Sequence, residues 1–170
     1  MSEIVLKKLN DPNDKEIPQL AEILEGSFAT AMADCLEEEK DMPVPNGEDI
    51  TKALQTELEI YKIYLDNVLV GGAVLNINRQ THHNQVELLF VSASDKGKGV
   101  GTRAWKKIEE TFPDTAVWEL GTPYFLKRNI HFYVNKCGFC ITKYYNQWNP
   151  LIEGDLVDPS DFFVFEKVMK

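Results

Sequence analysis

A glycine-rich loop that joins a predicted strand to a predicted helix constrains the fold of this chain most. The strand is the nearly continuous apolar segment 85–91, and apolar residues at helical spacing indicate a helix over segment 100–112. The loop between them reads Lys96-Gly97-Lys98-Gly99-Val100-Gly101-Thr102. In such a loop, backbone N–H groups and the positive end of the helix dipole point to one place, which favours an anion such as phosphate.

The spacing of these glycines excludes two common phosphate-binding loops. A P-loop requires Lys-Ser or Lys-Thr directly after its last glycine, and neither pair is present here. The dinucleotide-binding fingerprint requires a glycine at the position of Thr102. The sequence therefore supports neither an ATPase nor a Rossmann-fold dehydrogenase.

Charge is distributed unevenly along the 170 residues, whose formal net charge is −9. Residues 1–60 contain 5 Lys and 15 acidic residues, a net of −10, whereas segment 96–107 contains five bases and no acid. We expect no nucleic-acid partner, because nucleic-acid binding needs a basic surface. We expect the acidic part of the chain to face a cationic ligand and the glycine loop to face an anionic one.

Length and composition predict one globular domain over residues 1–170. The chain has no run of about 18 apolar residues, and its first residues lack the basic and apolar regions of a secretory signal. We therefore expect a soluble, cytoplasmic protein without a membrane partner. The three cysteines, an odd number, fit a reducing compartment.

Hydrophobic periodicity predicts a chain that mixes strands and helices. Strands are predicted at 4–8, 59–65, 68–77, 85–91, 116–120, 139–145 and 161–168, and helices at 14–39, 49–54, 100–112 and 127–136. Asp14 is the predicted N-cap of the first helix, and Asp66-Asn67 is the predicted tight turn of a hairpin. Gly71-Gly72 indicates a bulge or a close backbone approach. The acidic segment before the last strand is predicted to be a loop.

These motifs resemble the GNAT superfamily of N-acetyltransferases over essentially the whole chain. The acetyl-CoA loop of that family reads Gln or Arg, two variable residues, Gly, one variable residue, and Gly or Ala. Segment 96–101 matches it, with Lys96 in the first place. Upstream, Val91-Ser92-Ala93 stands where the family has Val-x-Pro. Downstream, Asn129, Tyr133 and Gly138-Phe139 resemble the second family motif, with five rather than the commoner four residues from the tyrosine to the glycine.

The resemblance implies a mixed α/β fold, in which a twisted, mostly antiparallel sheet of six or seven strands with a splayed central pair is accompanied by about four helices. It implies acetyl-CoA as cosubstrate and no metal. Residues 84–145 would form the core that binds acetyl-CoA, and residues 1–60 the side of the acceptor. The implied cofactor-binding residues are Leu89, Phe90 and Val91 for the pantetheine arm, Lys96, Gly97, Lys98, Gly99, Val100, Gly101 and Thr102 at the pyrophosphate loop, and Asn129, which bonds to the cofactor or caps its helix.

Glu87 and Tyr133 are the catalytic residues that the resemblance implies. Glu87, four residues before Val91, stands where some family members carry a carboxylate that takes a proton from the amine, directly or through water. The alternative is an acid that pairs with a neighbouring base or faces solvent. Tyr133 would protonate the departing thiolate, and the alternative is a tyrosine that only packs.

The predicted function is transfer of an acetyl group from acetyl-CoA to a primary amine, cationic in solution, of a small molecule or peptide. The amine would attack the thioester of acetyl-CoA directly. The resemblance to the family also implies a homodimer. The alternative is a non-catalytic acyl-CoA-binding module or sensor, which would need neither Glu87 nor Tyr133. A redox role for the pattern Cys137-Gly138-Phe139-Cys140 is disfavoured, because these cysteines end a predicted helix instead of starting one.

Overall fold

The computed structural model describes residues 2–158 and 160–169, and its largest element is a seven-stranded sheet with the strand order β1-β2-β3-β4-β5-β9-β6. Neighbouring strands are antiparallel except β4 and β5, which are parallel. This sheet confirms the predicted fold class. Its strands are β1 (Ile4–Leu9), β2 (Glu59–Leu65), β3 (Val68–Asn76), β4 (His83–Val91), β5 (Val117–Pro123), β6 (Cys140–Tyr145) and β9 (Phe162–Val168).

Four α-helices accompany the sheet within the described ranges: α1 (Ile17–Met32), α2 (Gly47–Ala53), α3 (Val100–Thr111) and α4 (Lys127–His131). α4 continues as a π-helical turn, Phe132–Lys136, and short 3₁₀ turns lie at Glu37–Glu39 and Ala93–Asp95. No helix of the described residues is long and apolar enough to cross a membrane.

Three local predictions were wrong. The first helix ends at Met32 rather than at residue 39, because the next large apolar residue, Leu36, is 61% exposed and offers no buried face to continue it. Asp14 does not cap this helix; the N-cap is Glu16, whose N–H donates to the Asp14 carboxylate. The acidic segment predicted as a loop contains a small separate hairpin of β7 (Leu151–Glu153) and β8 (Leu156–Asp158).

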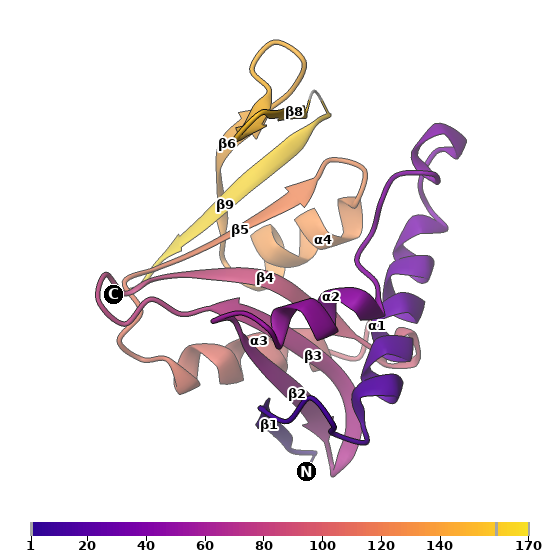
Figure 1. Ribbon diagram of the computed structural model, residues 1–170, viewed down its shortest axis with the longest axis vertical. Helices are drawn as coiled ribbons and strands as arrows, with labels where there is room; N and C mark the ends of the chain where they lie inside the picture. Colours follow the sequence, from indigo (N-terminus) through magenta and orange to yellow (C-terminus); the bar gives the residue numbers. More distant parts are fainter. Residues whose placement is uncertain (1, 159, 170) are drawn as a thin grey trace.

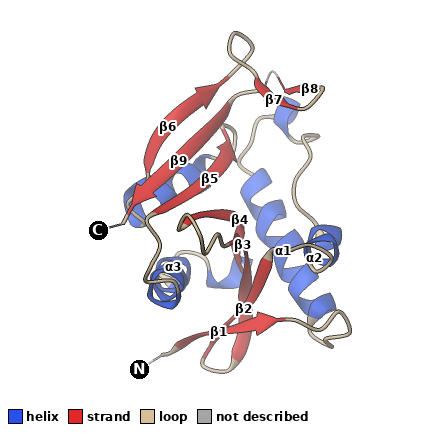
Figure 2. Ribbon diagram, turned by 60° about the vertical axis from the view of Figure 1, so that its left-hand side comes forward, coloured by secondary structure: helices blue, strands red, loops and turns tan. Residues whose placement is uncertain are grey.

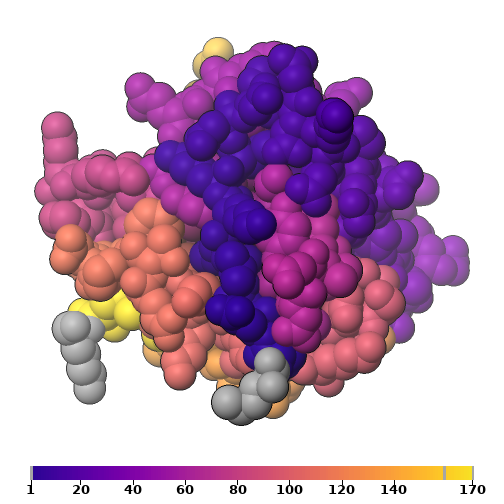
Figure 3. Space-filling model, turned by 90° about the horizontal axis from the view of Figure 1, so that it is seen from below, coloured from indigo at the N-terminus to yellow at the C-terminus, as the bar shows by residue number. Residues whose placement is uncertain are grey.

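The helices cover both faces of the sheet. α1 and α2 lie on one side of strands β1 to β4, and α3 lies on the other (Figures 1 and 2). Leu20 and Leu24 of α1 and Ile50 of α2 are fully buried in one core cluster, whereas Trp105 and Ile108 of α3 belong to another. Seen from below, the first strand runs as a narrow band across the surface, so β1 forms one edge of the sheet (Figure 3).

The hairpin of β2 and β3 has the predicted turn and the predicted close approach. Asp66 and Asn67 both have positive φ, 49° and 69°, as a type I′ turn requires. A Cβ atom on Gly71 would lie 2.2 Å from the carbonyl oxygen of Phe90 on the neighbouring strand β4. Only glycine therefore allows β3 to approach β4 this closely.

A partly buried ion-pair network fixes the start of α1 on the sheet. Lys62 of β2, 8% exposed, donates to Asp14 at 2.8 Å and to Glu16 at 3.0 Å, and the hydroxyl of Tyr64 also donates to Glu16 at 2.6 Å. The hydrogen bond from Lys62 lowers the pKa of Asp14, and the hydrogen bonds from Tyr64 and then Lys62 lower the pKa of Glu16. Both acids are therefore stabilised in their charged form.

We expect Lys62→Ala to lower the free energy of unfolding by about 2 kcal/mol at neutral pH, since a hydrogen bond to a charged group contributes about 1.5–3 kcal/mol. Because the folded-state pKa values of Asp14 and Glu16 are depressed, their stabilisation is present above about pH 4 and is lost as pH falls further. The difference between the variant and the unaltered protein should therefore shrink in acid. Urea unfolding at several pH values measures it.

The control for this experiment is Lys107→Ala, which removes an exposed pair with Glu110 at 3.7 Å. We expect a change within about 0.5 kcal/mol for this variant. An equally small and pH-independent effect of Lys62→Ala would contradict the stabilising role of the network.

Candidate active site

The sheet opens in its middle at Glu87. β4 pairs with β5 only from His83–Val86, opposite residues 117–120, and the two strands part beyond that point. On its other side, β4 pairs Val86 with Leu75 and Leu88 with Val74, so Glu87 has no partner on β3 and forms a bulge. A bulge bends the strand and redirects its side chain, which is why the opening begins at this residue.

A small pocket of about 190 Å³ lies where the two strands part. Glu87 and Leu89 of β4 line one side of it, and Asn129 and Tyr133 of the α4 segment line another. The edge of β4 that faces β5 has no strand partner over 87–91, the segment that contains the predicted pantetheine-binding residues Leu89, Phe90 and Val91. Backbone N–H and C=O groups on that edge are available to an extended ligand.

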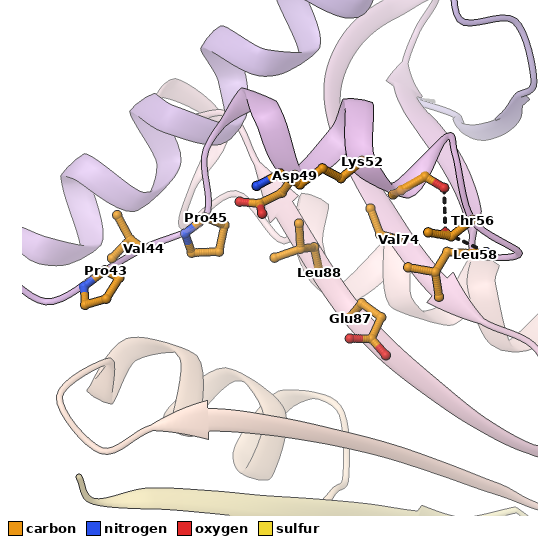
Figure 4. Close-up of a pocket in the computed structure, with 11 residues that line it drawn as sticks. Pro43, Val44, Pro45, Asp49, Lys52, Thr56, Leu58, Val74, Glu87 and Leu88 are labelled. Atoms are coloured by element: carbon orange, nitrogen blue, oxygen red, sulfur yellow. Dashed lines mark hydrogen bonds between the residues drawn. The ribbon is translucent and has the colours of Figure 1, made fainter. Parts of the chain in front are cut away.

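A larger pocket of about 490 Å³ shares five wall residues with the small one: Pro43, Val44, Pro45, Glu87 and Leu88. It continues beneath α2, with Asp49 and Lys52 on the helix side and Glu87 on the strand side (Figure 4). The two pockets therefore adjoin at Glu87.

The Glu87 side chain is exposed to solvent in this concave place. Partial desolvation raises the pKa of its carboxyl group, and the negative charge of Glu153 on the β7–β8 hairpin raises it further. Among the described residues, no side chain forms a hydrogen bond or an ion pair with Glu87. A carboxylate with a raised pKa and no partner can accept a proton more readily than an ordinary one.

Tyr133 is 6% exposed and lines the small pocket, so the two candidate catalytic residues face one space. Its ring packs edge-on against Phe132 and Phe139. Desolvation raises the pKa of its hydroxyl well above the ordinary value, which keeps the hydroxyl protonated at neutral pH. The Cys137 N–H bonds to the Phe132 carbonyl five residues earlier, and this π-turn accommodates the extra residue between Tyr133 and Gly138.

The glycine loop presents free backbone N–H groups at the start of α3. Gly97 and Gly99 have φ of 79° and 76°, in the left-handed region that glycine favours, and α3 begins at Val100. The first amides of a helix lack intrahelical acceptors, so those of Val100, Gly101 and Thr102 can donate to an anion.

The side chains of the predicted cofactor-binding residues Lys96, Lys98 and Asn129 lie in three different environments. Lys96 points to α1, where its Nζ donates to the Ser27 carbonyl at 2.8 Å, and burial followed by the charge of Arg128 lowers its pKa. Lys98 is exposed. Asn129 makes no side-chain cap of α4 and instead lines the small pocket. The loop backbone, rather than Lys96, is therefore available for phosphate.

Two other sequence signals lie away from the pockets. Burial raises the pKa of Cys137 to about 12, so this cysteine of the C-x-x-C pattern does not supply a thiolate at neutral pH. The acidic residues 37–39 and Asp41 belong to the first 60 residues, which we expect to face a cationic ligand, but they line neither pocket. Segment 43–45, which lines both pockets, was not among the residues that the sequence indicated.

The sheet order, the opening between β4 and β5 and the glycine loop at α3 define an acetyltransferase architecture. A family model described as the acetyltransferase (GNAT) family matches residues 19–139, and the chain belongs to this family, whose members transfer an acetyl group from acetyl-CoA.

Individual proteins are similar to the chain in sequence or in fold. The chain is 40% identical to the uncharacterized protein YrkN of Bacillus subtilis over 97% of its own length and 98% of that protein. Its fold is similar to that of the PaiA N-acetyltransferase from Thermoplasma acidophilum, solved in complex with coenzyme A, with a TM-score of 0.69, 16% identity, and coverage of 98% and 99% of the two chains. It is also similar to the ribosomal-protein-S18-alanine N-acetyltransferase from Escherichia coli, with a TM-score of 0.68, 11% identity, and coverage of 98% and 94%.

The loop geometry predicts that charge at Gly99 controls CoA affinity. We expect Gly99→Asp to weaken CoA binding at least tenfold, about 1.4 kcal/mol, because it places a negative charge at the pyrophosphate site. Gly99→Asn is the matched control, since Asn and Asp both tolerate positive φ. Calorimetry with CoA measures the difference. Equal affinities of the Asp and Asn variants would show that the anion binds elsewhere.

Proposed function

We propose that the protein transfers an acetyl group from acetyl-CoA to a primary amine of a small molecule or peptide, by direct attack of the amine. The observation that carries the proposal is that Glu87 and Tyr133 line one pocket at the opening of the sheet, with a second pocket adjoining at Glu87. A donor and an acceptor can thus meet between a candidate base and a candidate acid.

The residues present fit acetyl-CoA. The free amides of Gly99 to Thr102 would hold the pyrophosphate, and the unpaired edge of β4 would bond to the pantetheine arm. PaiA N-acetyltransferase, similar in fold, was solved with coenzyme A bound. When bound, the cosubstrate supplies the activated thioester, and the chain supplies position, which makes a bimolecular reaction effectively intramolecular.

Glu87 is the proposed base that removes a proton from the acceptor amine. A lysine-like amine has a pKa of about 10.4, so it arrives as ammonium and must lose a proton before it attacks. The Glu87 carboxylate, with its raised pKa and without a protein partner, accepts this proton directly or through water. A backbone N–H on the open edge of β4 would be free to donate to the oxygen on which negative charge develops.

Tyr133 is the proposed acid that gives a proton to the leaving sulfur. Its buried hydroxyl stays protonated at neutral pH and lines the small pocket, where it would donate to the sulfur as the C–S bond breaks. CoA would then leave as the thiol, and the Tyr133 phenolate would regain its proton from water.

The direct test is a screen of primary amines with acetyl-CoA and detection of the released thiol. We expect acetylated amine and free CoA in equal amounts. CoA binding without turnover on any amine would favour the sensor instead. Absence of both CoA binding and turnover would overturn the proposal.

We expect Glu87→Gln to lower kcat about 10²- to 10⁴-fold while CoA affinity is retained, because a general base contributes about that factor. The loss should shrink at high pH, where the acceptor deprotonates unaided. Glu153→Gln is the companion variant: it removes a negative charge that raises the Glu87 pKa, so the acid limb of kcat/KM should move to lower pH. A pH profile of Glu87→Gln that is parallel to that of the unaltered enzyme would contradict the role of base.

We expect Tyr133→Phe to lower kcat by a similar factor without recovery at high pH, since the leaving thiolate still lacks its proton donor. Tyr124→Phe is the control, because Tyr124 is 42% exposed and lines neither pocket. Full activity of Tyr133→Phe would assign the proton donation to water or to another group.

A further inference from the structure

We infer that the acceptor is a primary amine on an apolar body with no second positive charge. The inference rests on the proposed function and concerns the larger pocket, which adjoins the small pocket at Glu87 and continues beneath α2 (Figure 4). If the donor's reacting end occupies the small pocket between β4 and β5, the larger pocket is the space left for the acceptor.

The wall of the larger pocket is mainly apolar. Residues from three parts of the chain contribute to it: Pro43, Val44 and Pro45 before α2, Ala53 and Leu58 at and after its end, and Val74 and Leu88 of the sheet. A volume of about 490 Å³ lies in the range of pockets that bury a small organic molecule. Contact with such a wall makes the free energy of binding more favourable only for an apolar ligand, because only apolar surface gains from leaving water.

Most polar side chains of this wall are already engaged. The Asp49 carboxylate accepts the Asn46 N–H at 2.8 Å, and the Thr56 hydroxyl donates to the Ala53 carbonyl at 2.7 Å. Lys52 lies 3.8 Å from the Glu48 carboxylate. Asp49 and Lys52 line the same side of the pocket, so a cation placed there would meet the Lys52 ammonium as well as the Asp49 carboxylate.

Glu87 is thus the one charged side chain of this pocket's lining that forms no hydrogen bond or ion pair among the described residues. One carboxylate can receive one ammonium group. A second ammonium on the same acceptor would find only Asp49, whose carboxylate already accepts the Asn46 N–H and shares its side of the pocket with Lys52. Placing an incompletely paired charge against an apolar wall is costly. The acidic residues of the first 60 positions do not change this, because only Asp49 of them lines the pocket.

The test compares acceptors that differ in length or in one charge, using the unaltered protein and acetyl-CoA. From butylamine to hexylamine we expect kcat/KM to rise about fourfold per methylene, the factor that corresponds to burial of one CH₂ group. We expect 1,6-diaminohexane to be at least tenfold poorer than hexylamine.

A charge placed in the wall should reverse the preference. Leu58 lines only the larger pocket, so Leu58→Glu leaves the small pocket intact and offers a partner to a second ammonium. We expect this variant to raise kcat/KM for 1,6-diaminohexane relative to hexylamine at least tenfold. The matched variant Leu58→Gln should weaken hexylamine without improving the diamine.

The possible results distinguish failure of the inference about the acceptor from failure of the proposed acetyl transfer. Amines acetylated with no dependence on chain length, or a diamine preferred by the unaltered protein, would overturn the inference and leave acetyl transfer intact. If no amine is acetylated at all, the proposed function fails, and the inference fails with it.

Discussion

The parting of β4 and β5 beyond Val86 and Leu120 is the constraint on which the candidate site depends. Two parallel strands in the middle of a sheet normally satisfy each other's backbone groups along their whole length. Here the bulge at Glu87 ends that pairing and leaves the following edge of β4 open. The opening creates the small pocket, exposes backbone donors and acceptors, and leaves the Glu87 side chain in the wall shared by both pockets.

An open edge is tolerable only if β4 is held firmly from its other side. β3 provides this support, since Gly71 brings its backbone so close to the Phe90 carbonyl that no side chain could fit. Leu20 of α1 and the Phe90 ring belong to the same core cluster and cover that face. The network around Lys62 fixes the start of α1 on β2. The rigid half of the sheet thus positions the half that opens.

Part of the acidic first segment of the chain has a structural use. Several of its carboxylates neutralise specific bases: Asp14 and Glu16 pair with Lys62, Asp34 with Arg128, and Glu59 with Lys8 and Arg79. Glu59 is also the acceptor of the Tyr61 hydroxyl at 2.8 Å. Net charge summed over sequence therefore overstates the negative charge that an acceptor would meet, because pairing and distance remove most of it from the pockets.

The sequence by itself determined the order of strands and helices, the glycine loop at Gly97 to Gly101 and the family, because these depend on periodicity and on spacing between near neighbours. Only the tertiary structure decided where the first helix ends, that the segment after α4 forms a π-turn, and that segment 43–45 walls both pockets. It also brought Glu87 and Tyr133, 46 positions apart in the sequence, to one pocket. The bulge at Glu87 and the pocket walls depend on contacts between residues distant in sequence, which the local pattern does not encode. The π-turn is local, but the extra residue before Gly138 did not specify by itself how the chain would accommodate it.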